Sequence, residues 1–418
     1  MRKLKSYIII FVIFLSCGKL YSQELQTVGS AYSIFGIGDL NYYTSTRTYS
    51  MGIQGISLFG NYINNLNPAT LTKMGSTLIS VNANYGFLKS SNVNSQTEVS
   101  NGNVTGFNIG IPFDQVRGWV MSLGFNPMSL ANYKIKVLGN TGYQPYTQTY
   151  AGKGSVSRIS AGMSYNLFRK ISLGLEYNYS FGEINRQNFI NFSNSGFTNS
   201  NIRNQFDYRR SFLKGGMIFE MGRILKSISL TNLSIGFVFQ SGFNMTASED
   251  GIFGSSIGAD TVNLNSGTVN IPDSYGIGIS NIFNRKYLVS GDVLFQDWSK
   301  YRIFNQSNPD FQQSIRAGLG FEIIPNPDKA GFWQILTYRF GGFYEVGNFK
   351  IAGQSINSYG LRAGVNIPIS NYNSIDFGLG YSIRGESSNQ LIKEEFFNLT
   401  AGVNFGELWF LRPKEEDQ

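Results

Sequence analysis

The sequence of 418 residues contains no histidine, and its one cysteine is Cys17. Without histidine the chain lacks the usual general base at neutral pH, and with it the Ser–His arrangement of hydrolases. No cysteine follows Cys17, so most zinc and copper sites are excluded, as are disulfides in a chain cleaved after Ser22. We therefore expect no enzyme activity, no metal site and no cofactor.

The sequence is also poor in charge and in long apolar runs. Charged residues make up 14% of the chain, whereas a soluble domain usually carries about 25%. No run of ~20 apolar residues follows the first residues, so no transmembrane helix is expected. Aromatic residues reach 15% and glycines number 48, while the mean hydropathy is only -0.13. A membrane β-barrel reconciles these values, because only every second residue of its strands touches lipid.

The net charge of +8 raises the question of nucleic-acid binding. The lysines and arginines are scattered, however, and no basic helix stands out. We expect the basic side chains to face anionic lipid head groups of an outer membrane, and we expect no nucleic-acid partner.

Residues 1–22 have the pattern of a secretory signal peptide. Arg2, Lys3 and Lys5 precede the apolar stretch 7–15, which is too short to span a bilayer. Cleavage after Ser22 fits the sequence. Lipidation at Cys17 is the alternative, although the residues before it are larger than those usual for a lipidated cysteine. A cleaved signal peptide and a lipidated Cys17 both imply export of the chain. We expect its location to be the outer membrane of a Gram-negative bacterium.

Strict alternation is the strongest structural signal. In residues 375–383, every second side chain is apolar, and the intervening positions are Asp376, Gly378, Gly380 and Ser382. The pattern predicts an all-β protein, a transmembrane antiparallel barrel of about fourteen strands spanning residues 77–412. The predicted strands are 77–88, 104–113, 119–130, 155–167, 171–183, 208–221, 233–245, 273–283, 287–299, 313–323, 332–345, 357–369, 374–386 and 396–410.

A soluble β-sandwich would show the same alternation. The strand lengths favour the barrel, since ~9–11 residues cross a membrane. Tryptophans also flank predicted strands, where interfacial girdles belong; these are Trp119, Trp298, Trp333 and Trp409. Short turns such as 168–170 and 284–286 alternate with longer polar loops such as 184–207 and 246–272. This alternation predicts periplasmic short turns and two periplasmic termini, with a charged tail at 413–418.

Ionisable residues share the polar face of the predicted strands. Arginine or lysine on the lipid face would cost roughly 2–4 kcal/mol at midplane, so we place these residues in the lumen. The ordinary interpretation is an ion-pair network that holds the wall in register, rather than a catalytic carboxylate pair. The residues are Arg158, Glu176, Lys214, Glu220, Asp292, Arg316, Glu322, Arg362, Asp376 and Arg384.

Residues 23–76 do not alternate cleanly. They are too apolar for a flexible linker, which favours an N-terminal hatch or plug folded into the lumen. Asn67 and Pro68 suit the start of a short helix, with Asn67 as N-cap and Pro68 in the first turn. We predict a ligand pocket lined by apolar residues of this segment, namely Phe35, Ile37, Leu58 and Phe59.

The glycine-rich stretch, the Asn67-Pro68-Ala69 motif and the barrel that follows resemble the FadL/TodX outer-membrane transporters of hydrophobic compounds. Thr70 stands where many members have glycine. The resemblance implies a 14-stranded barrel plugged by a hatch, apolar ligand pockets, and lateral exit through a gap in the wall. Some relatives instead serve protein secretion or surface attachment, as in type IX secretion.

Asn126-Pro127 interrupts the third predicted strand. Proline cannot complete a central ladder, so it belongs at an edge or a bulge. A closed barrel has no edge, and Pro127 therefore predicts a bulge or break that could act as a lateral gate. The alternative is that Pro127 merely lies where this strand leaves the membrane.

Three functional interpretations remain open from the sequence. The first is passive uptake of fatty-acid- or hydrocarbon-like small molecules. The second is a barrel that binds a secretion or surface-protein partner. The third is a soluble secreted β-protein. A continuous apolar tunnel favours transport, whereas a lumen sealed by ion pairs favours partner binding.

Overall fold

A computed structural model describes residues 29–140, 144–192, 199–255, 258–325, 331–388 and 391–409. The predicted signal peptide and the charged tail lie outside these residues. Within them, no helix is long and apolar enough to cross a membrane.

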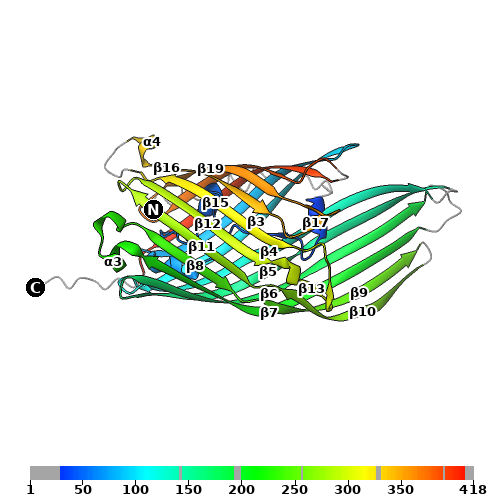
Figure 1. Cartoon of the computed structure of the whole chain (residues 1–418), viewed down its shortest axis with the longest axis horizontal. Coiled ribbons are helices and arrows are strands. Elements are labelled where there is room, and N and C mark those ends of the chain that lie inside the picture. Colours follow the sequence, from blue (N-terminus) through cyan, green and yellow to red (C-terminus); the bar gives the residue numbers. More distant parts are fainter. Residues whose placement is uncertain are drawn as a thin grey trace, which may run out of the picture.

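Fourteen antiparallel strands form a closed barrel, as the alternation predicted (Figure 1). The last strand pairs with the first over its whole length, from Thr77 opposite Glu407 to Ser91 opposite Lys393, which closes the ring. In chain order the barrel strands are β2 (Thr77–Ser91), β3 (Gln96–Asp114), β4 (Trp119–Asn140), β5 (Pro145–Leu167), β6 (Ile171–Phe192), β7 (Ser200–Glu220), β8 (Ser234–Gln240), β11 (Ser274–Phe283), β12 (Tyr287–Asp297), β15 (Gln313–Ile323), β16 (Thr337–Val346), β19 (Ser358–Pro368), β20 (Ser374–Arg384) and β21 (Lys393–Glu407).

The remaining elements precede the barrel or connect its strands. They are η1 (Ala31–Ile34), β1 (Asp39–Leu40), α2 (Thr46–Ser50), η2 (Pro68–Lys73), α3 (Met221–Leu225), η3 (Ile228–Leu230), β9 (Phe243–Ser255), β10 (Gly258–Ile271), η4 (Trp298–Lys300), β13 (Arg302–Ile303), β14 (Gln306–Ser307), α4 (Phe332–Ile335), β17 (Lys350–Ile351) and β18 (Gln354–Ser355).

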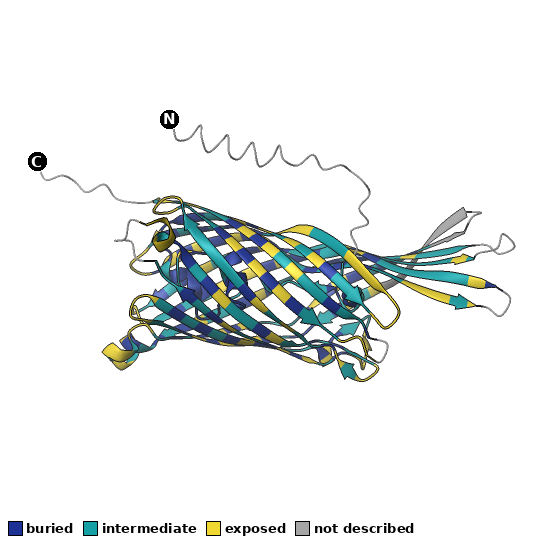
Figure 2. Cartoon of the chain, turned by 90° about the horizontal axis from the view of Figure 1, so that it is seen from above, coloured by how far each residue is buried: buried dark blue, intermediate teal, exposed yellow. Residues whose placement is uncertain are grey.

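Side chains alternate between an apolar exterior and a polar lumen, which Figure 2 shows as alternating exposed and buried residues along the strands. Leu361 and Leu379 on the outside are 74% and 49% exposed, whereas Arg362 and Asp376 on the inside are 8% and 5% exposed. A water-soluble protein rarely exposes a continuous apolar band of this kind. The exterior is therefore that of a membrane-spanning barrel.

One end of the barrel carries the short turns, and we call it the short-turn end. Phe168, Arg169, Asn284 and Arg285 all have positive φ there, as the central residues of type I′ hairpin turns require. The exposed Trp119, Trp333 and Trp409 lie at this end. Trp298 does not join them. It is 1% exposed and packs with aromatic residues at the opposite end, so its predicted place in a girdle is wrong.

The loops predicted at 184–207 and 246–272 are β-hairpins. β6 continues to Phe192 and β7 begins at Ser200, while β9 and β10 form a further hairpin that pairs with residues 200–209 of β7. Together with β4 and β5, these strands extend past the rest of the barrel (Figure 1). The predicted strand 233–245 is also broken, with β8 ending at Gln240 and β9 beginning at Phe243. Residues 243–249 of β9 still alternate between buried and more exposed positions, whereas 185–192 of β6 are partly or fully exposed on both faces, so the alternation that marks a strand is lost there.

Candidate functional site

Residues 29–76, which we call the N-terminal segment, pack against the inner wall of the barrel. Met51, Ile53 and Leu58 are fully buried. Wall glycines allow this close approach. A Cβ on Gly341 would lie 1.9 Å from the Met51 carbonyl oxygen, and one on Gly318 would lie 2.4 Å from that of Gly52. Glycine at these positions lets backbone meet backbone.

Ion pairs join the N-terminal segment to the wall. Arg47 of α2 binds Glu322 of β15 in a fork, with Nη2–Oε1 at 2.8 Å and Nε–Oε2 at 2.9 Å. Arg339 of β16 also donates to Glu322, at 2.7 Å, and pairs with Asp376 of β20. Glu322 thus binds two arginines, and one of them, Arg339, also binds Asp376. Such bidentate, charge-assisted contacts fix geometry more strictly than single hydrogen bonds do.

Two further wall residues bind the backbone of the N-terminal segment. The Asp292 carboxylate accepts the N–H groups of residues 54–56 at 3.1, 2.7 and 3.3 Å. The Lys214 ammonium donates to the Asn65 carbonyl oxygen at 2.7 Å and to Glu176 at 3.3 Å. The predicted lumen placement of these charges is confirmed, and several of them hold the segment itself.

The Asn67-Pro68-Ala69 motif begins η2, and the predicted cap is confirmed. The Asn67 side chain accepts the Ala69 N–H at 3.0 Å. Its amide donates to the Ile56 carbonyl oxygen at 2.6 Å and to that of Phe237, in the wall, at 3.3 Å. Asn67 thus caps a helix and ties two parts of the molecule together.

Asn67→Ala should destabilise the protein by about 1–3 kcal/mol, because it removes the cap and leaves a buried carbonyl oxygen without a donor. Thermal unfolding of the detergent-solubilised barrel measures the loss. Asn92→Ala, in the exposed β2–β3 turn, is the control and should change the unfolding temperature far less. Equal small shifts would contradict the role of Asn67.

The four predicted pocket residues do not line one cavity. Phe35 and Ile37 belong to an aromatic-rich cluster, in which the Phe35 ring stacks on Phe349 at 4.3 Å. Leu58 is fully buried in a separate cluster. Phe59 lies beside the Lys73 ammonium. Ile37 and Leu58 are therefore core residues, while Phe35 and Phe59 are partly buried.

Asn126 and Pro127 lie where β3 and β4 separate. The two strands pair from Asp114 opposite Trp119 to Phe107 opposite Phe125, and beyond that point no pairing joins them among the described residues. We call the unpaired stretch, between residues 96–106 and 126–140, the β3–β4 seam. A register shift between Pro127 and Ser129 interrupts the pairing with β5. The predicted bulge is thus confirmed, while the gate remains a prediction.

The N-terminal segment covers part of the free edge of β4. Asp39 and Leu40 of β1 pair with Leu130 and Ser129. The Gly29 N–H donates to the Asn132 carbonyl oxygen at 2.8 Å. The segment thus supplies backbone partners that β3 does not, as an unpaired strand edge in a membrane barrel requires.

Two small cavities of mixed polar and apolar lining lie between the N-terminal segment and the wall. One, of about 230 Å³, is bordered by Thr105 of β3 and Leu130 of β4, from opposite sides of the seam. Its neighbour, of about 220 Å³, shares Arg362 with it and reaches Phe35. Neither is an apolar tunnel along the barrel axis.

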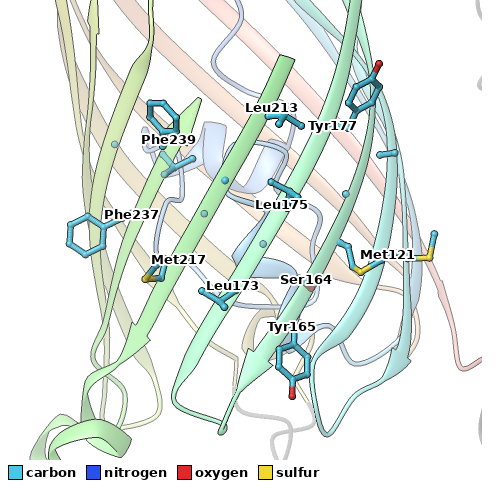
Figure 3. A pocket seen from close by; sticks show the side chains of 18 of the residues that line it. Met121, Ser164, Tyr165, Leu173, Leu175, Tyr177, Leu213, Met217, Phe237 and Phe239 are labelled. Carbon is cyan, nitrogen blue, oxygen red and sulfur yellow. The ribbon is translucent and has the colours of Figure 1, made fainter. Parts of the chain in front are cut away.

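A hollow of about 910 Å³ lies on the outside of the wall across β4–β8 and β11 (Figure 3). Gly215 is at its floor, opposite Leu175 on one neighbouring strand and Phe239 on the other. Leu175 and Phe239 are 59% and 43% exposed. This apolar surface faces lipid, so it is not a lumen pocket.

Sequence reasoning missed several partners of the lumen charges. Arg339 and Glu345 lie on a predicted strand, and alternation from the apolar positions could have placed Arg339 inside. Arg47 and Asp39 lie in the N-terminal segment, where no periodicity shows which way a side chain points. Their pairs with Glu322 and Arg384 appear only in the folded structure.

The fold is that of the FadL-like barrels. Similar solved structures include "CymD monoaromatic hydrocarbon channel" (14% identity, 90% of this chain and 100% of that chain, TM-score 0.56), a Pseudomonas aeruginosa FadL homologue (12%, 88% and 99%, 0.62) and the Pseudomonas putida toluene transporter TodX (14%, 90% and 100%, 0.58). At these identities the likeness shows the fold alone. The family model BamG matches residues 3–416, and the chain belongs to the BamG family. No curated protein matches the sequence.

Proposed function

We propose that this protein is an outer-membrane barrel that passes hydrophobic small molecules sideways through the β3–β4 seam. The observation that carries the proposal is the separation of β3 from β4 above Phe107 and Phe125, with a cavity behind it. The similar barrels include a monoaromatic hydrocarbon channel and a toluene transporter. Burial of apolar ligand surface, at about 25 cal/mol per Å², would drive capture.

In this proposal the N-terminal segment serves as the hatch, and the short-turn end faces the periplasm. The last described strand ends there, since Glu407 pairs with Thr77. Gly29 lies farther along the barrel, beside Asn132 in the outer part of β4. The expectation of two periplasmic termini concerns residues outside the described ranges.

Pro127→Val should lower uptake of a hydrophobic probe several-fold, because valine supplies the N–H that proline lacks and favours a continuous β4. Uptake into proteoliposomes measures the effect. Pro112→Val is the control, since Pro112 lies in β3 where it pairs with β4. Unchanged uptake in a folded Pro127→Val barrel would exclude the gate.

The second candidate function is partner binding, and the ion-paired lumen favours it. The described part of the chain shows no apolar tunnel, and five lumen arginines and lysines engage carboxylates or the N-terminal segment. The long hairpins β6–β7 and β9–β10 would offer a secretion or surface-protein partner a large polar sheet beyond the membrane.

A reversible cross-link across the seam separates the two functions. Thr105→Cys and Leu130→Cys place one thiol on each side of the same cavity, and a thiol-cleavable bifunctional reagent can join them. Transport through the seam predicts that cross-linking stops uptake and that reduction restores it. Partner binding predicts no effect on uptake. Thr105→Cys alone, treated identically, is the control.

A further inference from the structure

Arg362 of β19 is a buried cation enclosed by aromatic rings. Its side chain is 8% exposed. The guanidinium carbon lies 4.2 Å from the centre of the Tyr49 ring and 5.0 Å from that of Phe343. Its Nη1 donates to the Tyr49 hydroxyl. A Cβ on Gly380 would collide with this guanidinium, so glycine at that position keeps space for it.

Arg362, like Arg158 of β5, lacks the ion pair that three other arginines of the lumen have among the described residues. Arg316 pairs with Glu345, Arg339 with two carboxylates, and Arg384 with two others. No carboxylate among the described residues lies within ion-pair distance of Arg362, and its buried Nε has no hydrogen-bond acceptor there. A buried charge without a counter-charge is costly unless something else compensates it.

Unpartnered polar atoms gather around the same 230 Å³ cavity. Asn84 Oδ1 and Thr400 Oγ1 are buried without hydrogen-bond partners, and both residues line the cavity with Arg362. The Thr400 hydroxyl can donate to a bound anion, whereas Asn84 Oδ1 only accepts and suits a water beside it. Asp39 is the one carboxylate in the lining, and Arg384 already binds it. The other polar lining groups are neutral, and several of them can donate: Asn41, Tyr43, Ser45, Thr46, Tyr49, Asn103, Thr105 and Asn398.

The cavity has the size of a small polar ligand. At about 30 Å³ for each water in the liquid, its volume corresponds to roughly eight waters. This space suits one tetrahedral or planar oxyanion with some of its hydration shell. Arginine is well matched to such groups, because its planar fork donates two parallel hydrogen bonds to carboxylate or phosphate oxygens.

We infer that this cavity is a binding site for a compact oxyanion group, a carboxylate, phosphate or sulfate, held by Arg362 and reached from the β3–β4 seam. A purely hydrophobic solute would leave Arg362 unpaired, so the site goes beyond the proposed function. The group can belong to a free ion or to the head of an amphiphile, since both present the same oxygens.

Titration calorimetry on the full-length barrel in neutral detergent tests the inference. The probes are inorganic phosphate, sulfate and acetate as free ions, and dihexanoyl phosphatidic acid, below its micelle concentration, as an amphiphile. Wild-type protein should bind at least one probe. Stronger binding of the lipid assigns the site to a head group, and equal binding of phosphate assigns it to the free ion. No binding of any probe overturns the site.

Two variants locate the binding. Arg362→Gln should weaken it about tenfold or more, because a charge-assisted contact is lost. Arg117→Gln, in an exposed turn, should not. Thr105→Phe narrows the cavity from the β3 side and leaves Arg362 in place, so it should also abolish binding even if Arg362→Gln fails to fold. Binding unchanged in either Arg362→Gln or Thr105→Phe overturns the inference.

Discussion

Glu322→Gln is expected to destabilise the barrel by about 3–5 kcal/mol, the usual cost of breaking a buried ion pair from one side. Arg339 would keep Asp376, but Arg47 would lose its carboxylate partner. Arg47 is also the link between α2 and β15, although Tyr49 of α2 has a separate contact with Arg362 of β19. Glu322→Gln should therefore mainly weaken the attachment of the N-terminal segment to the wall. The hydrogen bonds between the barrel strands should remain.

Two measurements separate loosening of the N-terminal segment from unfolding of the barrel. Thermal unfolding in detergent should shift downward, and protease should cut the segment at lower concentrations while the barrel still migrates as a folded species. Glu98→Gln removes an exposed carboxylate from β3 and should change neither result. Protection of the segment equal to wild type in Glu322→Gln would show that the ion pairs do not hold it.

Gly216→Val and Gly215→Val form a matched pair with opposite expected results. A Cβ on Gly216 would lie 1.8 Å from Asn67 Oδ1, whereas one on Gly215 meets nothing within 4 Å. The Asn67 side chain cannot simply rotate away, because it caps η2 and bonds two carbonyl oxygens. Gly216→Val should therefore cost about 1–3 kcal/mol, as overpacked cores do.

Gly215→Val should be nearly neutral, since it adds an apolar β-branched side chain to a lipid-facing strand. Unfolding of both variants from lipid vesicles in urea gives the comparison directly. Equal destabilisation would mean that strand propensity, rather than contact with Asn67, decides the outcome. Greater loss in Gly215→Val would reverse the assignment of the inner and outer faces.

The barrel could be predicted because one face of each strand meets hydrocarbon and the other does not. In β20, the apolar positions 375, 377, 379, 381 and 383 alternate with Asp376 and Ser382, and the structure follows that order. Outside the membrane neither face of a strand meets hydrocarbon, so this difference between the two faces is weaker. Residues 184–192 therefore read as a loop, although they continue β6 in full register with β5 and β7.

The candidate site was predictable only in part. Alternation placed Glu322 and Asp376 in the lumen, because the lipid face would penalise them. Alternation could not identify Arg47 as the partner of Glu322, since the N-terminal segment folds without a regular period. The cap at Asn67 was predictable because capping is local chemistry. The separation of Phe35 from Leu58 was not, because it depends on how the segment crosses the lumen.

The most direct test of the account measures which side chains face lipid. In a Cys17→Ser background, single cysteines at Leu361, Leu379, Ser290 and Ser382 would carry nitroxide spin labels in vesicles. The account predicts that oxygen dissolved in the bilayer relaxes the labels at 361 and 379 strongly, while those at 290 and 382 are shielded. Strong relaxation by bilayer oxygen at 290 and 382, with shielding at 361 and 379, would contradict it.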